Sequence, residues 1–306
     1  MTVTEAGEAT AEREPETGPE ASPEGRADPR GFLRRSPLLG VGAAILGLVV
    51  LVALAAPLLT KWDPRAITGR ALEPPSGRHW LGTDVPGRDI FAQLVFGARA
   101  SVTVAIVSGS LAMLTAIVIG VLPALLGGVA DAAANRFTVF LLALPGLPLL
   151  VLIGSLAGDR RLAVILVIGF LGAAPNARIL RSQALSLRER GYVASAKGLG
   201  GSRLYVLRRH IVPGLGPLIV VGFVNWAALS VGLEAGLSFL GIGNPSGISW
   251  GLMLNRALSQ QSIYFSSMWT WWVLTAGLAI TLTVVGLTFV GVALEPTFNP
   301  RWLRST

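Results

Sequence analysis

The residues with the clearest chemical potential lie in one basic stretch of the chain, residues 188–213, between two long apolar runs. Apolar side chains recur in this stretch at helical spacing, and Gly200 and Gly201 interrupt the pattern. Ser202 is placed to cap a second helix, which Pro213 is predicted to end. A connection that only joins two apolar runs has no need of a polar helix pair. The segment is therefore predicted to dock a soluble partner.

Glu234 is the only carboxylate deep inside an apolar run. Acidic residues in such positions are often functional, and this one could bind a substrate amine or titrate in a proton-coupled carrier. The alternative is a structural role, in which Glu234 caps or pairs near the outer end of a membrane span, and we favour that interpretation. His79 has no second ligand nearby in the sequence, so no metal site is expected.

Several kinds of chemistry are excluded by what the sequence lacks. There is no cysteine, which rules out disulfides, thiol catalysis and zinc-thiolate sites. No G-x-x-x-x-G-K-[ST] loop is present, and the turn at Gly200 and Gly201 has neither the spacing nor the lysine of a phosphate-binding loop. We expect no catalytic residues, no metal and no cofactor on this chain.

The composition indicates an integral membrane protein. Of 306 residues, 52% are hydrophobic and only 14% are charged, too apolar a balance for a soluble protein of this size. A hydrocarbon core of about 30 Å needs roughly 20 helical residues. The sequence therefore predicts an all-α protein with six membrane-spanning helices, at residues 38–59, 100–126, 137–156, 162–174, 214 to about 233, and 268–294.

The predicted spans divide the chain into four regions. Residues 1–30 are rich in Glu, Pro and Ala and should form a disordered acidic tail, while 31–98 hold the first span and an extracytoplasmic loop. Residues 99–295 form the core, and 296–306 a C-terminal tail. More Lys and Arg lie in the loops and termini on the side of the membrane that holds the amino terminus than on the other side. Both termini are therefore predicted to be cytoplasmic in a multi-pass cell-membrane protein. Nucleic-acid binding is disfavoured because the basic residues flank the spans.

The basic stretch resembles the cytoplasmic signature of binding-protein-dependent ABC importer permeases, which reads Glu-Ala-Ala, three residues, Gly, nine residues, then Ile-x-Leu-Pro. Other segments narrow the resemblance to the dipeptide, oligopeptide and nickel permeases, in particular the subunit with the shorter first external loop. The matching residues are Ala194, Ser195, Ala196, Gly200 and Pro213 in the signature, Leu81 to Asp84, Gly87 to Asp89, Gly97 to Arg99, Pro145, Leu237 to Gly241, Ser249 to Gly251, and Leu294 to Pro296.

The resemblance implies a type I ABC importer fold, in which a cytoplasmic coupling-helix pair at about residues 188–210 contacts the ATPase. It also implies the partners: a second homologous permease, two ATPase subunits that hold ATP and Mg, an extracytoplasmic solute-binding protein, and membrane lipid. The residues that it assigns to ATPase coupling are Arg188, Glu189, Tyr192, Ala194, Ser195, Ala196, Lys197, Gly198, Leu199, Gly200 and Pro213.

The sequence departs from the family pattern in two places. Gly191 and Ala194 stand where the family usually has glutamates, so docking would depend more on shape and on nearby charges. Asn176 replaces a customary aromatic residue of the fourth span, and with Pro145 and Glu234 it is a candidate for the translocation pathway or for a structural role. These departures bear on the solute more than on the coupling.

Two other functional classes remain open. A secondary, ion-coupled transporter would need an inverted repeat or a buried titratable relay, and one glutamate makes a poor relay. A purely structural role is disfavoured because prolines interrupt the spans, as they do in helices that move or line cavities. The sequence therefore predicts the permease subunit of an ATP-driven importer for peptides or similar small solutes.

Overall fold

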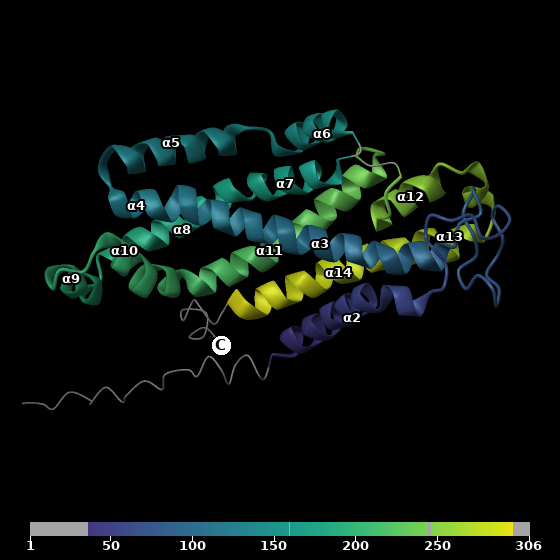
Figure 1. Ribbon diagram of the computed structural model, residues 1–306, viewed down its shortest axis with the longest axis horizontal. Coiled ribbons are helices and arrows are strands. Elements are labelled where there is room, and N and C mark those ends of the chain that lie inside the picture. The colour runs from purple at the N-terminus through teal and green to yellow at the C-terminus, as the bar shows by residue number, and fades with distance from the viewer. Residues whose placement is uncertain (1–35, 159, 244–245, 296–306) are drawn as a thin grey trace, which may run out of the picture.

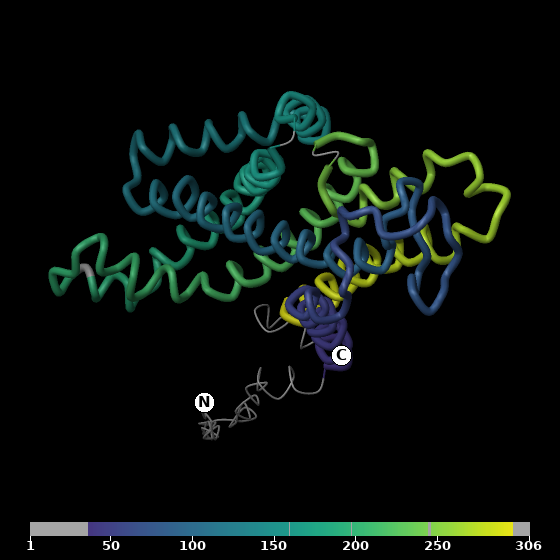
Figure 2. Tube along the Cα trace, turned by 45° about the vertical axis from the view of Figure 1, so that its right-hand side comes forward, coloured from purple at the N-terminus to yellow at the C-terminus, as the bar shows by residue number. Residues whose placement is uncertain are grey.

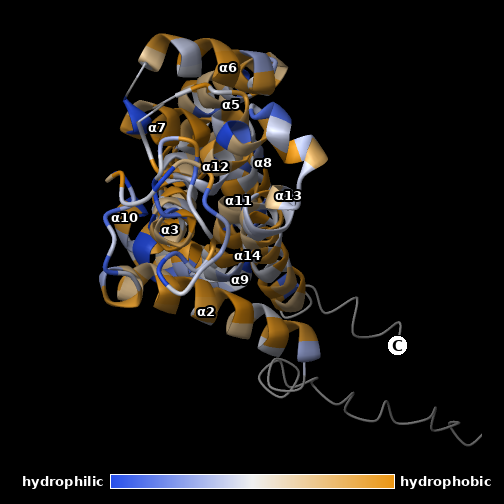
Figure 3. Ribbon diagram, turned by 90° about the vertical axis from the view of Figure 1, so that its right-hand side faces the viewer, coloured by the Kyte–Doolittle hydropathy of each residue, from blue (hydrophilic) through white to orange (hydrophobic). Residues whose placement is uncertain are grey.

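The computed structural model describes residues 36–158, 160–243 and 246–295, and every regular element in these ranges is a helix. The helices form an elongated bundle (Figure 1). Helices α9 (Gly191–Gly198) and α10 (Arg203–Val206) lie at one end, and the loop that precedes α3 (Ile90–Ala116) lies at the other. The outward surfaces of α2 (Pro37–Leu59) and α6 (Gly146–Ala157) are predominantly hydrophobic, as expected where lipid surrounds them (Figure 3).

The prediction of six spans is confirmed in its essentials. Within the described ranges, five stretches are long and apolar enough to cross a membrane, and a sixth becomes possible if two bent helices count as one span. The five are Pro37–Leu59, Ile90–Leu126, Arg161–Arg188, Arg203–Phe239 and Met268–Leu294, and the bent pair is Gly128–Ala143 with Gly146–Ala157.

The first two spans begin at side-chain caps. Ser36 accepts a hydrogen bond from the backbone N–H of Leu39 at the start of α2, and Asp89 accepts one from that of Ala92 at the start of α3. Because Asp89 starts the helix, the second span begins at Ile90 and not near residue 100. It continues through the π-turn η1 (Ile117–Val121) and the short α4 (Leu122–Leu126).

The predicted third span, residues 137–156, is broken by a sharp bend. Two helices, α5 (Gly128–Ala143) and α6, replace it, and they are bent by 80° where Leu144 and Pro145 separate them. Both residues have extended backbone conformations, and for Leu144 the reason is that a residue before proline is pushed out of the helical region. Pro145 is thus the residue before the first turn of α6.

The fourth span is longer than predicted. Helix α7 (Arg161–Leu171) passes at Gly172 into α8 (Ala173–Arg188), and together they make one stretch of 28 residues. Pro175 lies in the first turn of α8, where its missing N–H breaks no intrahelical bond. At the junction the indole of Trp226 packs onto Gly172, so closely that a Cβ atom there would overlap the ring.

The prediction that Pro213 ends a short helix is also wrong. Helix α10 continues through the π-turn η2 (Leu207–Ile211) into α11 (Val212–Phe239), where Pro213 lies in the first turn. In the π-turn the N–H of Val212 donates to the carbonyl of Leu207, five residues earlier. This wider turn accommodates Pro213, which has no N–H of its own to donate. The second half of the predicted helix pair is therefore the start of a span.

Helix α3 is central, and it packs against α11, α2, α7 and α8. The last span, α13 (Met268–Trp271) with α14 (Val273–Leu294), packs against α2 and α11, and α12 (Trp250–Leu258) covers α11 and α14 near the loop end. At α3 the indole of Trp250 lies against Gly97 and donates to the carbonyl of Leu94 at 2.8 Å. Figure 2 shows that α9 and α10 extend beyond the rest of the bundle.

Candidate functional site

The candidate site is the projecting segment that joins α8 to α11. Helix α8 ends at Arg188, and α9 follows as a helix of eight residues. At its end Gly200 has φ +85°, and the N–H of Gly201 donates to the carbonyl of Ala196 at 2.9 Å, which is the bond of a Schellman C-cap. Ser202 then accepts from the N–H of Tyr205 at 3.2 Å and starts α10. The predicted glycine interruption and the predicted cap are confirmed.

One buried residue attaches α9 to the bundle. Val193 is fully buried in an apolar cluster with Leu187, Val206 and Ile211, which belong to the end of α8 and to the start of the fifth span. Most other described side chains of the segment are exposed, and Leu199 at the tip is 90% exposed. The predicted coupling residues Tyr192, Ala194, Ser195, Gly198 and Gly200 also lie on this exposed surface, Ala196 is half-buried, and Lys197 is in the last turn of α9.

Two arginines of α8 connect this segment to the second and third spans. Arg188 donates to the carbonyl of Ala124 in α4 at 3.0 Å and to the carboxylate of Glu189 at 3.1 Å. Arg181 makes a two-point ion pair with Asp131 of α5, at 2.7 and 2.8 Å. A displacement of α9 would therefore also move α4 and α5. This pairing could not be predicted from the sequence, because the partners are 50 residues apart.

An aromatic contact closes the base of the segment. The His210 ring lies 5.8 Å from the ring of Tyr192 and 5.7 Å from that of Tyr205, measured between centroids. Tyr192 belongs to α9, and the other two residues belong to the start of the span Arg203–Phe239. Sequence reasoning included Tyr192 but missed its partners, because residues five apart do not share a face of a regular α-helix and the π-turn that holds His210 was not predicted.

A cavity of about 1050 Å³ lies between α8 and α11. Asn176 lines it, as do Gln183, Asn225 and Trp226, and its charged members are Arg190 and Glu295. Asn176 is held by a hydrogen bond from its amide nitrogen to the carbonyl of Gly172 at 2.8 Å. The other two candidates for the pathway do not line this cavity: Pro145 lies at the bend between α5 and α6, and Glu234 faces elsewhere.

Glu234 is buried inside α11. One of its carboxylate oxygens accepts a hydrogen bond from Ser238 at 2.9 Å, one helical turn away. It lines a separate cavity of only about 30 Å³, which Arg161 and Ser249 also line. This volume leaves no room for a peptide, and the contact agrees with the structural interpretation of Glu234.

The long loop before α3 is a compact, hydrogen-bonded structure. His79 is fully buried, and its Nδ1 lies 2.8 Å from the carboxylate of Asp89. The ring also stacks on Trp62 at 5.2 Å. Since Asp89 caps α3, this contact fixes the loop to the start of the second span. Within the described ranges, no three His, Asp or Glu side chains gather where they could hold a metal ion.

The sequence matches a family model whose description is binding-protein-dependent transport system inner membrane component, over residues 116–304. The chain belongs to this family. It is 37% identical to a putative peptide permease protein of Brucella suis over 266 residues, 85% of this chain and 87% of the relative. A probable D,D-dipeptide transport system permease of Escherichia coli is 34% identical, over 88% of this chain and 90% of its own. An oligopeptide transport system permease of Bacillus subtilis is 31% identical, over 88% and 87%.

These findings confirm the resemblance drawn from the motifs: the chain is an ABC importer permease of the peptide family. With its apolar helices, membership places it in the inner membrane as a multi-pass protein. The family consists of permease subunits and not of catalytic ones. The segment at α9 falls within the matched range, residues 116–304.

Proposed function

We propose that the chain forms half of the translocation pathway of an ATP-driven importer for peptides. We also propose that α9 contacts an ATPase subunit and transmits its conformational change to the spans. A second homologous permease would form the other half. Two ATPase subunits would hold ATP and Mg, and an extracytoplasmic binding protein would deliver the solute. Both termini and α9 then lie on the cytoplasmic side. The names of the relatives support peptides as the solute class.

One observation carries the proposal: α9 is exposed at its tip and rigidly attached at its base. Leu199 offers an apolar contact to a partner, while Val193 is buried between the ends of two spans. A force applied at the tip would reach α8 and α11 directly, and through Arg188 and Arg181 it would reach α4 and α5. Since α8 and α11 line the cavity of about 1050 Å³, their displacement would open or close it.

The lining of this cavity suits a solute rich in peptide groups. Asn176, Gln183 and Asn225 are neutral amides that can donate and accept hydrogen bonds, and Ile179, Leu218 and Leu229 add apolar surface. Neutral amides hydrogen-bond any peptide backbone without selecting for the charge of its side chains. Selection among peptides would then belong to the binding protein.

The test is uptake of a labelled tripeptide into proteoliposomes that contain the complete complex. Uptake should require ATP and should persist when a proton ionophore is added. Leu199→Glu should abolish both uptake and co-purification of the ATPase, because it puts a charge into the apolar contact. Leu199→Met is the matched control and should retain both. Uptake without ATP, or its loss to the ionophore at constant ATP, would instead support an ion-coupled carrier.

A further inference from the structure

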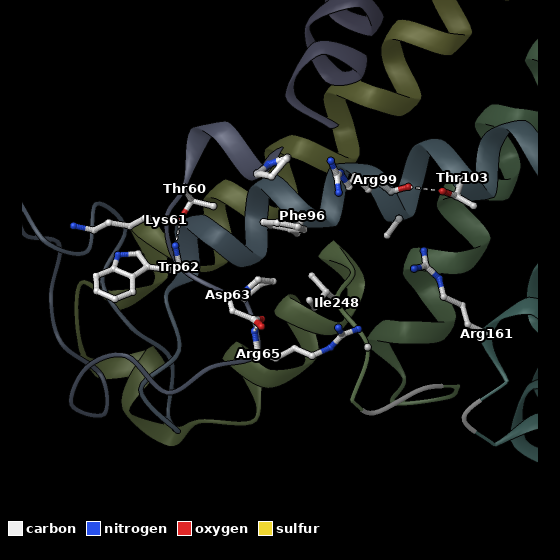
Figure 4. Close-up of a pocket in the computed structure, with 14 residues that line it drawn as sticks. Thr60, Lys61, Trp62, Asp63, Arg65, Phe96, Arg99, Thr103, Arg161 and Ile248 are labelled. Carbon is white, nitrogen blue, oxygen red and sulfur yellow. Dashed lines mark hydrogen bonds between the residues drawn. The ribbon is translucent and has the colours of Figure 1, made fainter. Parts of the chain in front are cut away.

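A second large cavity lies at the end of the bundle opposite α9. Its volume is about 540 Å³, and it is bounded by the end of α2, residues 96–103 of α3, the first residue of α7, and the loop residues 60–65 and 247–248. In Figure 4, the side chain of Arg161 extends from α7 toward the stretch of α3 that carries Phe96, Arg99 and Thr103, and the side chain of Arg65 extends from the loop alongside this stretch. Neither the family match nor the peptide pathway between α8 and α11 assigns a role to this cavity.

The cavity is strongly basic. Among the described residues that line it, four are basic and Asp63 is the single acidic one. Asp63 already accepts a hydrogen bond from the backbone N–H of Arg65 at 2.8 Å. The Arg99 guanidinium is held in place, since it donates to the carbonyls of Ala53 at 2.6 Å and Leu54 at 3.3 Å and lies over the ring of Phe96. The cavity thus presents pre-organised cations with little internal neutralisation.

Arg161 is the strongest sign of a ligand. Its Nε and one Nη are buried and have no hydrogen-bond partner in the described part of the chain. Glu234 lines the small cavity behind it, yet the two side chains form no ion pair among those of the described residues. A buried guanidinium without an acceptor is costly, so an arginine in this setting favours an anionic ligand that approaches through the larger cavity.

The chemistry next to the cavity indicates what kind of anion this is. From Arg99 an exposed stripe runs along α3 toward the middle of the membrane, at Thr103, Ile106, Leu114 and Val118. The three apolar residues are 53%, 62% and 55% exposed. Trp62, which also lines the cavity, is an aromatic residue of the type found at the level of lipid head groups. A cationic pocket at that level above an apolar stripe fits a molecule with an anionic head and a hydrocarbon tail.

We propose that this cavity binds an anionic phospholipid. Its phosphate is held by Arg65, Arg99 and Arg161, and one acyl chain lies along the exposed stripe of α3. Guanidinium groups suit this role because their N–H groups match the geometry of phosphate oxygens. The bound lipid neutralises Arg161 and joins α2, α3 and α7 at the end of the bundle that carries the loop. The proposal does not depend on what the permease transports.

The experiment is native mass spectrometry of the full-length chain in mild detergent, with palmitoyl-oleoyl phosphatidylglycerol or the phosphatidylcholine of the same acyl chains added at equal concentration. The unsubstituted chain should retain one phosphatidylglycerol in preference to phosphatidylcholine. Arg161→Gln should weaken that binding by about tenfold, the effect of losing one charge-assisted contact. Arg161→Lys should keep part of the preference. Arg160→Gln is the control, because Arg160 is exposed and lines neither cavity.

Three results would overturn the proposal. The first is equal retention of both lipids by the unsubstituted chain, and the second is an equal loss in Arg160→Gln and Arg161→Gln. The third comes from competition with trialanine and with its C-terminal amide. If only the peptide with a free carboxylate displaces phosphatidylglycerol, the cations serve the carboxylate of a solute and not a lipid.

Discussion

The turn at Gly200 offers a direct test of how α9 is set on the bundle. With φ +85°, Gly200 has a left-handed conformation, which an L-residue adopts only at a cost of about 1–2 kcal/mol. A Cβ atom added there meets nothing within 4 Å, so the cost of Gly200→Ala comes from the backbone alone. Gly198 is the matched control. It lies in the last turn of α9, and its Cβ would also meet nothing, so Gly198→Ala should stabilise the helix by about 0.5–1 kcal/mol.

These opposite signs translate into opposite changes in local opening. A cost of about 1–2 kcal/mol raises the open fraction of the α9 C-cap by a factor of roughly 5–30. The reporters are the N–H groups of Leu199 and Gly201, which donate to the carbonyls of Ser195 and Ala196. In hydrogen-exchange mass spectrometry of the purified chain, these amides should exchange faster by about that factor in Gly200→Ala and more slowly in Gly198→Ala.

The first of these variants also links the turn to transport. Gly200→Ala should reduce ATP-dependent peptide uptake while the chain still inserts and purifies normally, because the change is confined to the angle and order of α9. Gly198→Ala is the control for hydrogen exchange only, because Gly198 itself belongs to the predicted coupling surface. If both variants exchange at the rate of the unsubstituted chain, the left-handed turn does not determine the order of α9 and the reasoning fails.

Three further substitutions test other contacts. Gly172→Ala pushes a methyl group into the indole of Trp226 and should lower the melting temperature, since overpacking costs about 1–3 kcal/mol; Gly216→Ala, which meets nothing within 4 Å, should not. Asp131→Asn breaks the ion pair with Arg181 and should also lower the melting temperature, whereas Glu189→Gln should change it little, because Glu189 is 75% exposed. Gly232 lies on an open surface of α11, where we expect the second permease to pack. Gly232→Trp should therefore leave the chain folded but prevent co-purification of the second permease. A complex that forms normally would contradict this contact.

The elements that could be predicted from the sequence are those with local causes. The first span ends where the apolar run ends, and α9 ends where a glycine pair permits a left-handed turn. Ser202 caps α10 through a backbone group only three residues away. In each case the residues that determine the structure are neighbours in the chain, so their types and spacing are sufficient.

The elements that could not be predicted depend on distant partners. Helix α8 extends to Arg188 because its polar side chains find acceptors on α4 and α5, which hydropathy alone does not register. His79 reads as a surface residue until the loop folds back and brings it to Asp89. The cavity lined by Arg161 was also invisible, since it joins residues from the loop, α3 and α7 that are up to 191 positions apart, from Pro57 to Ile248.

The second and fifth spans each contain a π-turn. The positions of these turns indicate where the two spans would bend if α9 were displaced. The π-turns Ile117–Val121 and Leu207–Ile211 each end two residues before a proline, Pro123 in one span and Pro213 in the other. Their last residues, Val121 and Ile211, are fully buried in the cluster that holds Val193. A π-turn followed by proline is where a helix bends most readily. The base of α9 therefore rests against the two places where the second and fifth spans yield most easily, and we expect a push on α9 to bend these spans there while their packed regions around α3 stay rigid.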